Sequence, residues 1–239
     1  MLHDWREPDR GRRLDGDLIV QTPVPYLPNW INGKESGPER DAWLDKFDPH
    51  SGELLSRFAD SSENDVDRAI SAAGGAFSNW AELTPVRRGQ IASEIVDAMK
   101  RCRGELAECA ARETGKLPRD AQNEVGAAIL QGEYFAGEGM RFYGRSLTSG
   151  VPGKYSHTVR QPCGIVGLIV PANTPIANIA WKVFPAIVCG NTVVLKASED
   201  APHTALLFAR LATEAGVPKG VVNVVQGRGR VAGAALQGT

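Results

Sequence analysis

Three polar side chains follow two short apolar segments of the 239-residue chain and could carry chemistry there. Asn173 lies in a turn bracketed by two prolines, directly after the apolar run 164–170. Lys196 and Glu199 follow a second apolar run, 192–195. An amide donor fixed in a turn can stabilise negative charge that develops on a carbonyl oxygen. A lysine and a carboxylate in the second turn can hold the hydroxyls of a ribose.

Each of these residues would also fit an ordinary structural role. Asn173 could satisfy the backbone of its own turn. Ser198 and Glu199 could cap the next helix, with Lys196 facing solvent. If the pair does bind a dinucleotide, the charge of Glu199 would repel a 2′-phosphate and so favour NAD over NADP. That preference is small, because a glutamate side chain can swing aside.

The segments around these residues follow a β-α-β pattern. The run 164–170 predicts a strand buried on both faces of a parallel sheet. The segment 176–188 predicts a helix in which Pro185 causes a kink or an early stop, and Gly190 fits a left-handed cap. A strand over 192–195 completes the unit. Ligands bind beyond the carboxyl ends of strands in such sheets.

A glycine-rich run follows a third predicted strand, 221–225. The run Gly227-x-Gly229-x-x-x-Gly233 misses the G-x-G-x-x-G spacing of the dinucleotide fingerprint by one residue. No acidic residue follows at the distance that the fingerprint requires. By itself the run therefore does not identify a dinucleotide site.

The N-terminal half predicts short strands and then helices. Turns are expected at Asn32-Gly33 and Ser51-Gly52. Ser62 with Asp65 predicts a capping box, and Thr84-Pro85 predicts the start of a second helix. Two further helices are expected, one ending near Gly115 and one beginning after Pro118.

Taken together, these motifs resemble the aldehyde dehydrogenase superfamily. In that family a Pro-x-Asn turn precedes a helix, a Gly-Asn pair starts the next strand, and a Lys-Pro-Ser-Glu turn follows. The corresponding stretches here are Pro171-Ala172-Asn173, Gly190-Asn191 and Lys196-Ala197-Ser198-Glu199. Arg112-Glu113-Thr114-Gly115-Lys116 resembles a fourth family motif, to which we assign a packing and turn role. Alanine replaces a common aromatic residue in the first motif and a common proline in the third.

The resemblance implies a role for each candidate residue. Asn173 would be the oxyanion-hole asparagine that holds the aldehyde oxygen during attack by a thiol. The cofactor would be NAD, with NADP as an alternative, and no metal is implied. The residues implied to bind this cofactor are Val170, Pro171, Ala172, Lys196, Ser198, Glu199 and Gly229. Of these, Val170 and Pro171 would line the nicotinamide ribose, and Gly229 would lie beside the adenine.

The catalytic cysteine and the glutamate base of the family are expected beyond residue 239. The resemblance covers residues 29–239, which is about half of a family member. The four cysteines, Cys102, Cys109, Cys163 and Cys189, lack metal-ligand spacing and are expected to be buried thiols in a reducing compartment. None of them is expected to be the nucleophile, so we expect this chain alone to be inactive.

The predicted fold is α/β, a truncated aldehyde dehydrogenase fold. It would contain a Rossmann-like parallel sheet, an N-terminal helical region and a projecting β-hairpin arm. We divide the chain into a flexible extension (1–28), N-terminal strands and helices (29–141), the arm (142–162) and an incomplete cofactor-binding segment (163–239). The family uses this arm for oligomer contacts, which implies a homo-oligomer. The alternative is a surface hairpin folded back on its own domain.

Composition narrows the function classes. The net charge is −1, from 27 basic and 28 acidic residues, so no nucleic-acid partner is expected. There is no long apolar stretch and no secretory signal, so we expect a cytoplasmic protein without a membrane partner. The implied activity is oxidation of a small-molecule aldehyde to a carboxylic acid through a cysteine thiohemiacetal. Two alternatives stay open: a non-catalytic truncated paralogue that binds nucleotide or partner subunits, and a fragment of an acylating, CoA-dependent aldehyde dehydrogenase.

Overall fold

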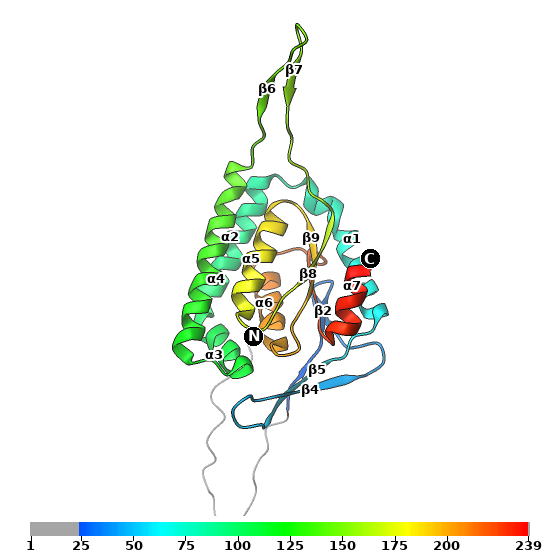
Figure 1. Ribbon diagram of the computed structural model, residues 1–239, viewed down its shortest axis with the longest axis vertical. Helices are drawn as coiled ribbons and strands as arrows, with labels where there is room; N and C mark the ends of the chain where they lie inside the picture. Colours follow the sequence, from blue (N-terminus) through cyan, green and yellow to red (C-terminus); the bar gives the residue numbers. More distant parts are fainter. Residues whose placement is uncertain (1–23, 239) are drawn as a thin grey trace, which may run out of the picture.

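The structure, a computed structural model, describes residues 24–238. A five-stranded sheet separates two helical layers (Figure 1). The strands are β1 Tyr26–Leu27, β2 Asn29–Ile31, β3 Lys34–Ser36, β4 Trp43–Phe47, β5 Leu54–Ala59, β6 Ser146–Thr148, β7 Tyr155–His157, β8 Ile165–Ile169, β9 Thr192–Lys196 and β10 Val222–Val225. The helices are α1 Glu63–Glu82, α2 Pro85–Arg101, α3 Arg103–Thr114, α4 Pro118–Glu138, α5 Pro175–Val188, α6 Pro202–Glu214 and α7 Ala234–Gly238, with a π-helical turn η2 at Gly229–Gly233 before α7.

The α/β class is confirmed, but the sheet is mixed and not purely parallel. Its strand order is β3-β2-β10-β9-β8. Strands β8, β9 and β10 are parallel, whereas β2 pairs with β10 in the antiparallel sense. Strands β2 and β3 form a hairpin, because Asn32 (φ 54°) and Gly33 (φ 72°) adopt the positive φ angles that a two-residue loop requires. Strands β1, β5 and β4 form a separate small sheet.

Helices cover the two faces of the main sheet unequally. Helix α1 packs against β9 and β10 on one face, and α7 lies beside α1 (Figure 1). Helices α5 and α6 lie on the other face, with α2, α3 and α4 stacked outside them (Figure 1). The larger apolar core fills this second side and includes the edge-to-face pair Phe184 and Phe208.

Strand β8 is less buried than the sequence predicts. Strand β9 is buried throughout, but Ile165 and Ile169 of β8 are 42% and 40% exposed. Among the described residues β8 is the edge strand of the sheet, with β9 as its only neighbour. The prediction that both faces of this strand are buried is therefore wrong for Ile165 and Ile169.

Helix α5 continues past its internal proline. We expected Pro185 to cause a kink or an early stop, but the helix ends only at Val188. Two side chains of the N-terminal helices hold the residues that follow this proline. Trp80 Nε1 donates to Ile187 O (3.0 Å), and Arg88 Nε donates to Val188 O (2.9 Å). These donors satisfy carbonyls at the helix end. Gly190 follows with φ 92°, which confirms the predicted left-handed position.

The local signals of the N-terminal helices are confirmed. Ser62 and Asp65 form a complete capping box at α1, and Thr84 caps α2. Gly115 ends α3 with φ 71°. Both predicted turns join antiparallel strand pairs, β2 with β3 and β4 with β5. Within residues 24–238 no helix combines the length and apolar character needed to cross a bilayer.

The segment 142–162 is an extended hairpin. Strands β6 and β7 pair in the antiparallel sense and project away from the helices (Figure 1). Tyr155 is 87% exposed and Val151 is 57% exposed. The hairpin is therefore not folded back on its own domain.

The first strand lies before the boundary that we set at residue 28. Tyr26 and Leu27 form β1, which pairs with Arg57 and Phe58 of β5. Leu27 is buried in a small cluster with Phe58 and Leu206, which explains its place in the fold. Residues 1–23 of the expected extension lie outside the described residues.

Candidate functional site

The predicted site residues lie along one edge of the sheet, at the carboxyl ends of three neighbouring parallel strands. Asn173 follows β8, Lys196 ends β9 with Glu199 after it, and Gly229 follows β10. Backbone contacts connect the segments, since Val170 N donates to Lys196 O (3.3 Å) and Gly229 N donates to Glu199 Oε1 (2.8 Å). This edge is where ligands bind in open α/β sheets.

The side chain of Asn173 is exposed and leaves its donor free. Its Oδ1 accepts from Asn178 Nδ2 (3.3 Å), and its backbone carbonyl accepts from Lys116 Nζ (2.8 Å). Among the described residues, its Nδ2 has no hydrogen-bond partner. The alternative role, an asparagine that satisfies the backbone of its own turn, is not what the structure shows.

A buried ion pair holds the turn that carries Asn173. Lys116 Nζ contacts Glu124 Oε2, and the two side chains are only 16% and 4% exposed. Glu124 Oε1 accepts from Ile176 N (2.9 Å) and Ala177 N (3.3 Å), the first amides of α5. Lys116 therefore connects the helix cap to the Asn173 carbonyl. The packing role that we assigned to the 112–116 motif includes this direct contact with a predicted site residue.

A second buried carboxylate caps α6. Glu113 accepts from His203 N (2.6 Å), Thr204 N (2.8 Å) and Thr204 Oγ1 (2.7 Å). Burial raises the pKa of Glu113 to about 7, although these three donors oppose the shift. The pKa of the neighbouring His203 falls to about 4, first because of burial and then because of Arg210 and Arg112.

These two carboxylates occupy the helix N-termini at which an anionic ligand could otherwise bind. A free helix N-terminus attracts phosphate through its unpaired N–H groups. Here Glu124 already occupies the first amides of α5, and Glu113 occupies those of α6. A pyrophosphate therefore has no binding place at either helix start.

Lys196 lies at the centre of this edge. It is 4% exposed, and burial lowers its pKa, while Glu199 and Asp200 act in the opposite direction. No residue between 24 and 238 contacts its ammonium group as a hydrogen-bond or ion-pair partner. A buried lysine without a protein partner is free to donate to a ligand hydroxyl.

The turn after β9 differs from the capping alternative. Ser198 Oγ accepts from Asp200 N (3.2 Å) within its own turn, and α6 begins only at Pro202, with Ala201 at the cap position. Ser198 and Glu199 therefore do not cap α6. Glu199 is exposed, and its carboxylate accepts from Gly229 N. The predicted cofactor residues Glu199 and Gly229 therefore lie next to each other at this edge of the sheet.

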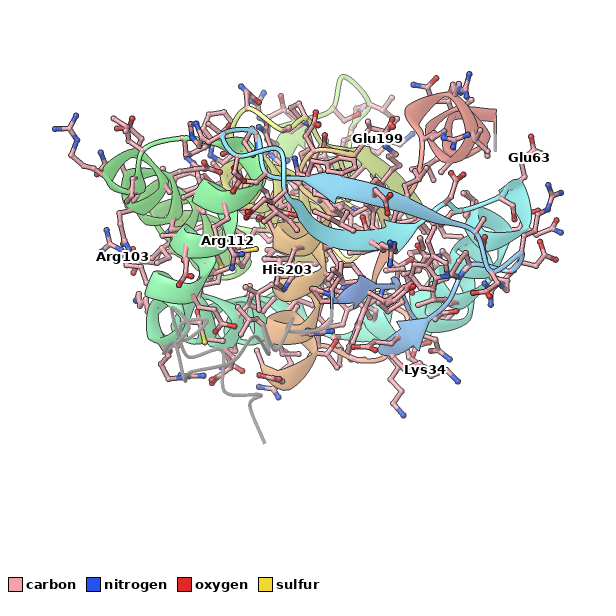
Figure 2. The ribbon with its side chains drawn as sticks, turned by 90° about the horizontal axis from the view of Figure 1, so that it is seen from below. Lys34, Glu63, Arg103, Arg112, Glu199 and His203 are labelled. Atoms are coloured by element: carbon pink, nitrogen blue, oxygen red, sulfur yellow. The ribbon has the colours of Figure 1, made fainter. Side chains whose placement is uncertain are left out.

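The remaining predicted residues form the segment that leads to Asn173. Val170 is buried at 4% exposure, Ala172 is half-buried and Pro171 is exposed. Figure 2 shows Arg112 of α3 beside His203 of α6, with Glu199 apart from that pair. The cluster around His203 is therefore separate from the ribose-side residues.

The cysteines do not gather at this edge. All four are free thiols, and Cys109 is buried beside Glu113. We predicted that all four are buried, but only Cys109 is: Cys163 is exposed, and Cys102 and Cys189 are half-buried. In the described part of the chain no group of three or more His, Cys, Asp or Glu residues could hold a metal ion.

Sequence reasoning missed Glu124 and Asn178, and it gave Lys116 no contact with the site. The contact from Lys116 to Asn173 spans 57 positions, and no local pattern indicates it. Asn178 could have been found from its spacing, because it lies four residues after Thr174 on a predicted helix.

The comparisons with known proteins agree with this arrangement. The model for "Aldehyde dehydrogenase family" matches residues 36–239. The chain belongs to the aldehyde dehydrogenase family.

Its curated relatives include a mitochondrial benzaldehyde dehydrogenase of Antirrhinum majus. That protein is 35% identical over 93% of this chain and 42% of its own length. Alpha-ketoglutaric semialdehyde dehydrogenase of Bacillus subtilis is 37% identical over 88% of this chain and 43% of its own length. This chain thus spans less than half the length of these aldehyde dehydrogenases.

Solved structures of the family show the same fold. PnpE from a Pseudomonas species, in complex with nicotinamide adenine dinucleotide, has a TM-score of 0.85 and 36% identity over 87% of this chain and 43% of its own. An NADP dependent enzyme of E. coli has a TM-score of 0.86 and 33% identity over 88% of this chain and 44% of its own.

Proposed function

We propose that this chain supplies the oxyanion donor and the ribose-binding side of an enzyme that oxidises an aldehyde to a carboxylic acid with NAD. One observation carries the proposal: consecutive strand ends present an unpaired amide donor at Asn173 and an unpaired buried ammonium at Lys196. Membership of the aldehyde dehydrogenase family supports it.

Asn173 would act on the oxygen of the substrate. Attack by a thiolate on the aldehyde carbon forms a C–S bond and moves the carbonyl electron pair onto oxygen. The Nδ2 group of Asn173 would donate to this oxygen, and it is free to do so in the structure. Loss of a hydride from the same carbon then restores the carbonyl as a thioester, which water hydrolyses to the acid and the free thiol.

Lys196, Glu199 and Gly229 would hold the adenosine side of NAD, which supplies the hydride acceptor when it is bound. The residues fit this group, because Lys196 is an unpaired donor and the exposed Glu199 carboxylate is close enough for its charge to act on Lys196. Val170 and Pro171 would border the nicotinamide ribose, Ala172 would also contact the cofactor, and Ser198 would shape the turn. A 2′-phosphate would meet the charge of Glu199, so we propose NAD ahead of NADP.

The nucleophile would come from outside these residues. Cys163 precedes β8 and Asn173 follows it, so the full five-residue strand lies between them, a length of roughly 16 Å at about 3.3 Å per residue. Cys109 is buried in another layer, beside Glu113 and Thr204. For the 239-residue chain alone we therefore expect no aldehyde-dependent formation of NADH.

Oligomer formation through the 142–162 arm is part of the proposal. The arm exposes Leu147, Val151, Tyr155 and Val159 and projects from the helices (Figure 1). A two-stranded hairpin of this kind gains stability by packing on a partner. Replacing 148–155 by a short glycine-serine turn should lower the mass measured by light scattering, and an unchanged mass would remove the arm from the interface.

The free thiols also support a location in a reducing compartment, for which we propose the cytoplasm. The Antirrhinum majus relative, in contrast, is named mitochondrial.

The proposal is tested first by activity and cofactor binding. The complete protein should form NADH, followed at 340 nm, when aldehyde and NAD are supplied, and should bind NAD more tightly than NADP. Glu199→Gln should reduce that preference, whereas Glu94→Gln on the exposed side of α2 should not. NADH formation that requires coenzyme A would indicate an acylating enzyme. Absence of both activity and NAD binding would contradict the proposal.

A further inference from the structure

We propose that Asn178 is a positioning residue that selects which atom of the Asn173 side chain faces the reacting oxygen. This inference rests on the proposed oxyanion role of Asn173. Asn178 lies in the first turns of α5 and is half-buried. Its side chain turns back toward the residues that precede the helix, where it contacts Thr174 and Asn173.

The contacts fix the orientation of the Asn178 amide. One terminal atom of this amide lies 3.0 Å from Thr174 O and 2.8 Å from Thr174 Oγ1. A backbone carbonyl only accepts hydrogen bonds, so this atom must be the NH2 group, Nδ2. The same Nδ2 lies 3.3 Å from the side chain of Asn173.

The orientation of Asn178 then determines that of Asn173. The two hydrogens of this NH2 group are shared among Thr174 O, Thr174 Oγ1 and, at the longest distance, Asn173. The Asn173 atom that faces it is Oδ1, because a second NH2 group in that place would oppose donor to donor. The Nδ2 group of Asn173 is thereby turned away from Asn178 and stays available. If the Asn173 amide were flipped, its oxygen would face the developing negative charge and the stabilisation would become repulsion. Lys116 holds the backbone of Asn173, and Asn178 orders its side chain.

Two substitutions separate this role from simple space filling. Asn178→Asp keeps the size of the side chain, but its carboxylate cannot donate. It therefore loses the bond to Thr174 O, and Asn173 is driven to turn its NH2 group toward the carboxylate. An acidic residue near the start of a helix is tolerated, so this variant should fold. Asn178→Ala removes the donor without repulsion and leaves the Asn173 amide free to take either orientation.

We expect the two variants to differ in a defined order. In the complete protein kcat should fall at least tenfold for Asn178→Asp and only a few-fold for Asn178→Ala, with KM changed less than about threefold. The loss in kcat should not exceed the roughly 100- to 1000-fold loss that follows complete removal of an oxyanion donor. A space-filling role predicts the opposite order, because the aspartate fills the site and the alanine does not. The control is Asn79→Asp on α1, an exposed asparagine in the helical layer on the opposite face of the sheet from α5.

A second readout does not depend on activity. In protein labelled with 15N-asparagine, the Asn173 side-chain NH2 signals, assigned with Asn173→Ala, should shift in Asn178→Asp as this group turns toward residue 178. Asn79→Asp should leave them in place. Unchanged signals, or a kcat loss in Asn178→Ala that equals or exceeds the loss in Asn178→Asp, would overturn the inference. If the protein lacks aldehyde oxidation but the signals shift as stated, the proposed function fails while the orienting contact stands.

Discussion

The starts of α5 and α6 are built alike and differ in one charge. Each helix follows a strand of the sheet, and each receives a buried carboxylate from the N-terminal helices: Glu124 for α5 and Glu113 for α6. Glu124 is paired with Lys116, whereas no cation within residues 24–238 lies in ion-pair contact with Glu113. The paired cap adjoins Asn173, and the unpaired cap adjoins His203.

Both caps consist of a carboxylate that accepts from the first amides of a helix, but the contact has a different consequence in each. At α6 burial raises the pKa of Glu113 to about 7 against three hydrogen-bond donors and the charge of Lys46, so ionisation of this carboxylate lowers the stability of the folded protein. At α5 the lysine compensates the carboxylate and also donates to the Asn173 carbonyl. The helix that follows Asn173 thus has an ion-paired cap, and the same lysine also holds the turn in which the predicted donor lies.

The largest expected effect comes from breaking the paired cap. Lys116→Met leaves the Glu124 charge buried without its partner and should lower the free energy of unfolding by about 3 kcal/mol. Urea unfolding measures this. The control is Lys100→Met, which removes surface pairs with Glu133 (2.7 Å) and Asp97 (3.6 Å) and should cost less than about 1 kcal/mol. Equal losses in the two variants would contradict the special role of the α5 cap.

The unpaired cap should make stability depend on pH. The pKa of Glu113 is about 7 in the folded protein, against an ordinary value of 4.5. Between pH 4.5 and 7 the folded state therefore binds more protons than the unfolded state. The contribution of Glu113 is fully present below pH 4.5 and is lost as the pH rises through 7, by roughly 3 kcal/mol for this difference in pKa. In Glu113→Gln this part of the slope between pH 5 and 7.5 should disappear. The matched Glu94→Gln variant should keep the slope, and persistence of the slope in Glu113→Gln would refute the assignment.

Much of the fold follows from local signals that the sequence contains. Ser62 with Asp65, Gly115 and Gly190 lie where caps and turns are predicted, because each depends on a few neighbouring residues. The continuation of α5 past Pro185 depends on Trp80 and Arg88, which bond to residues 107 and 100 positions away in the sequence. Distant partners of this kind leave no pattern in a single sequence.

The candidate site, like the fold, can be predicted from the sequence only in part. Ligands bind at the carboxyl ends of strands, and this rule alone places Asn173, Lys196 and Glu199 at one edge of the sheet. Asn173 needs more than its own turn, however. Lys116 holds its carbonyl from 57 positions away, and the Glu124 cap reaches α5 across 52 positions. These contacts arise only from packing of the helical layers.

A smaller effect is expected on the reactivity of the thiol beside the Glu113 cap. Burial, and then Glu113, raise the pKa of the Cys109 thiol well above its ordinary value, and this thiol lies 3.8 Å from Glu113 Oε2. In the native protein a thiol reagent should modify the exposed Cys163 first and Cys109 last, as followed by mass spectrometry. Glu113→Gln should change the rate at Cys109 alone. A parallel change at Cys163 would mean that the substitution loosens the whole fold.

The most direct test of the account is Asn173→Ala in the complete protein, measured for both turnover and unfolding. The Asn173 side chain is exposed, so the free energy of unfolding should change by less than about 0.5 kcal/mol. Aldehyde-dependent NADH formation should fall roughly 100- to 1000-fold in kcat, because the oxyanion loses its donor. A variant that turns over like wild type, or that loses activity only because it unfolds, would contradict the claim that the fold presents Asn173 for catalysis.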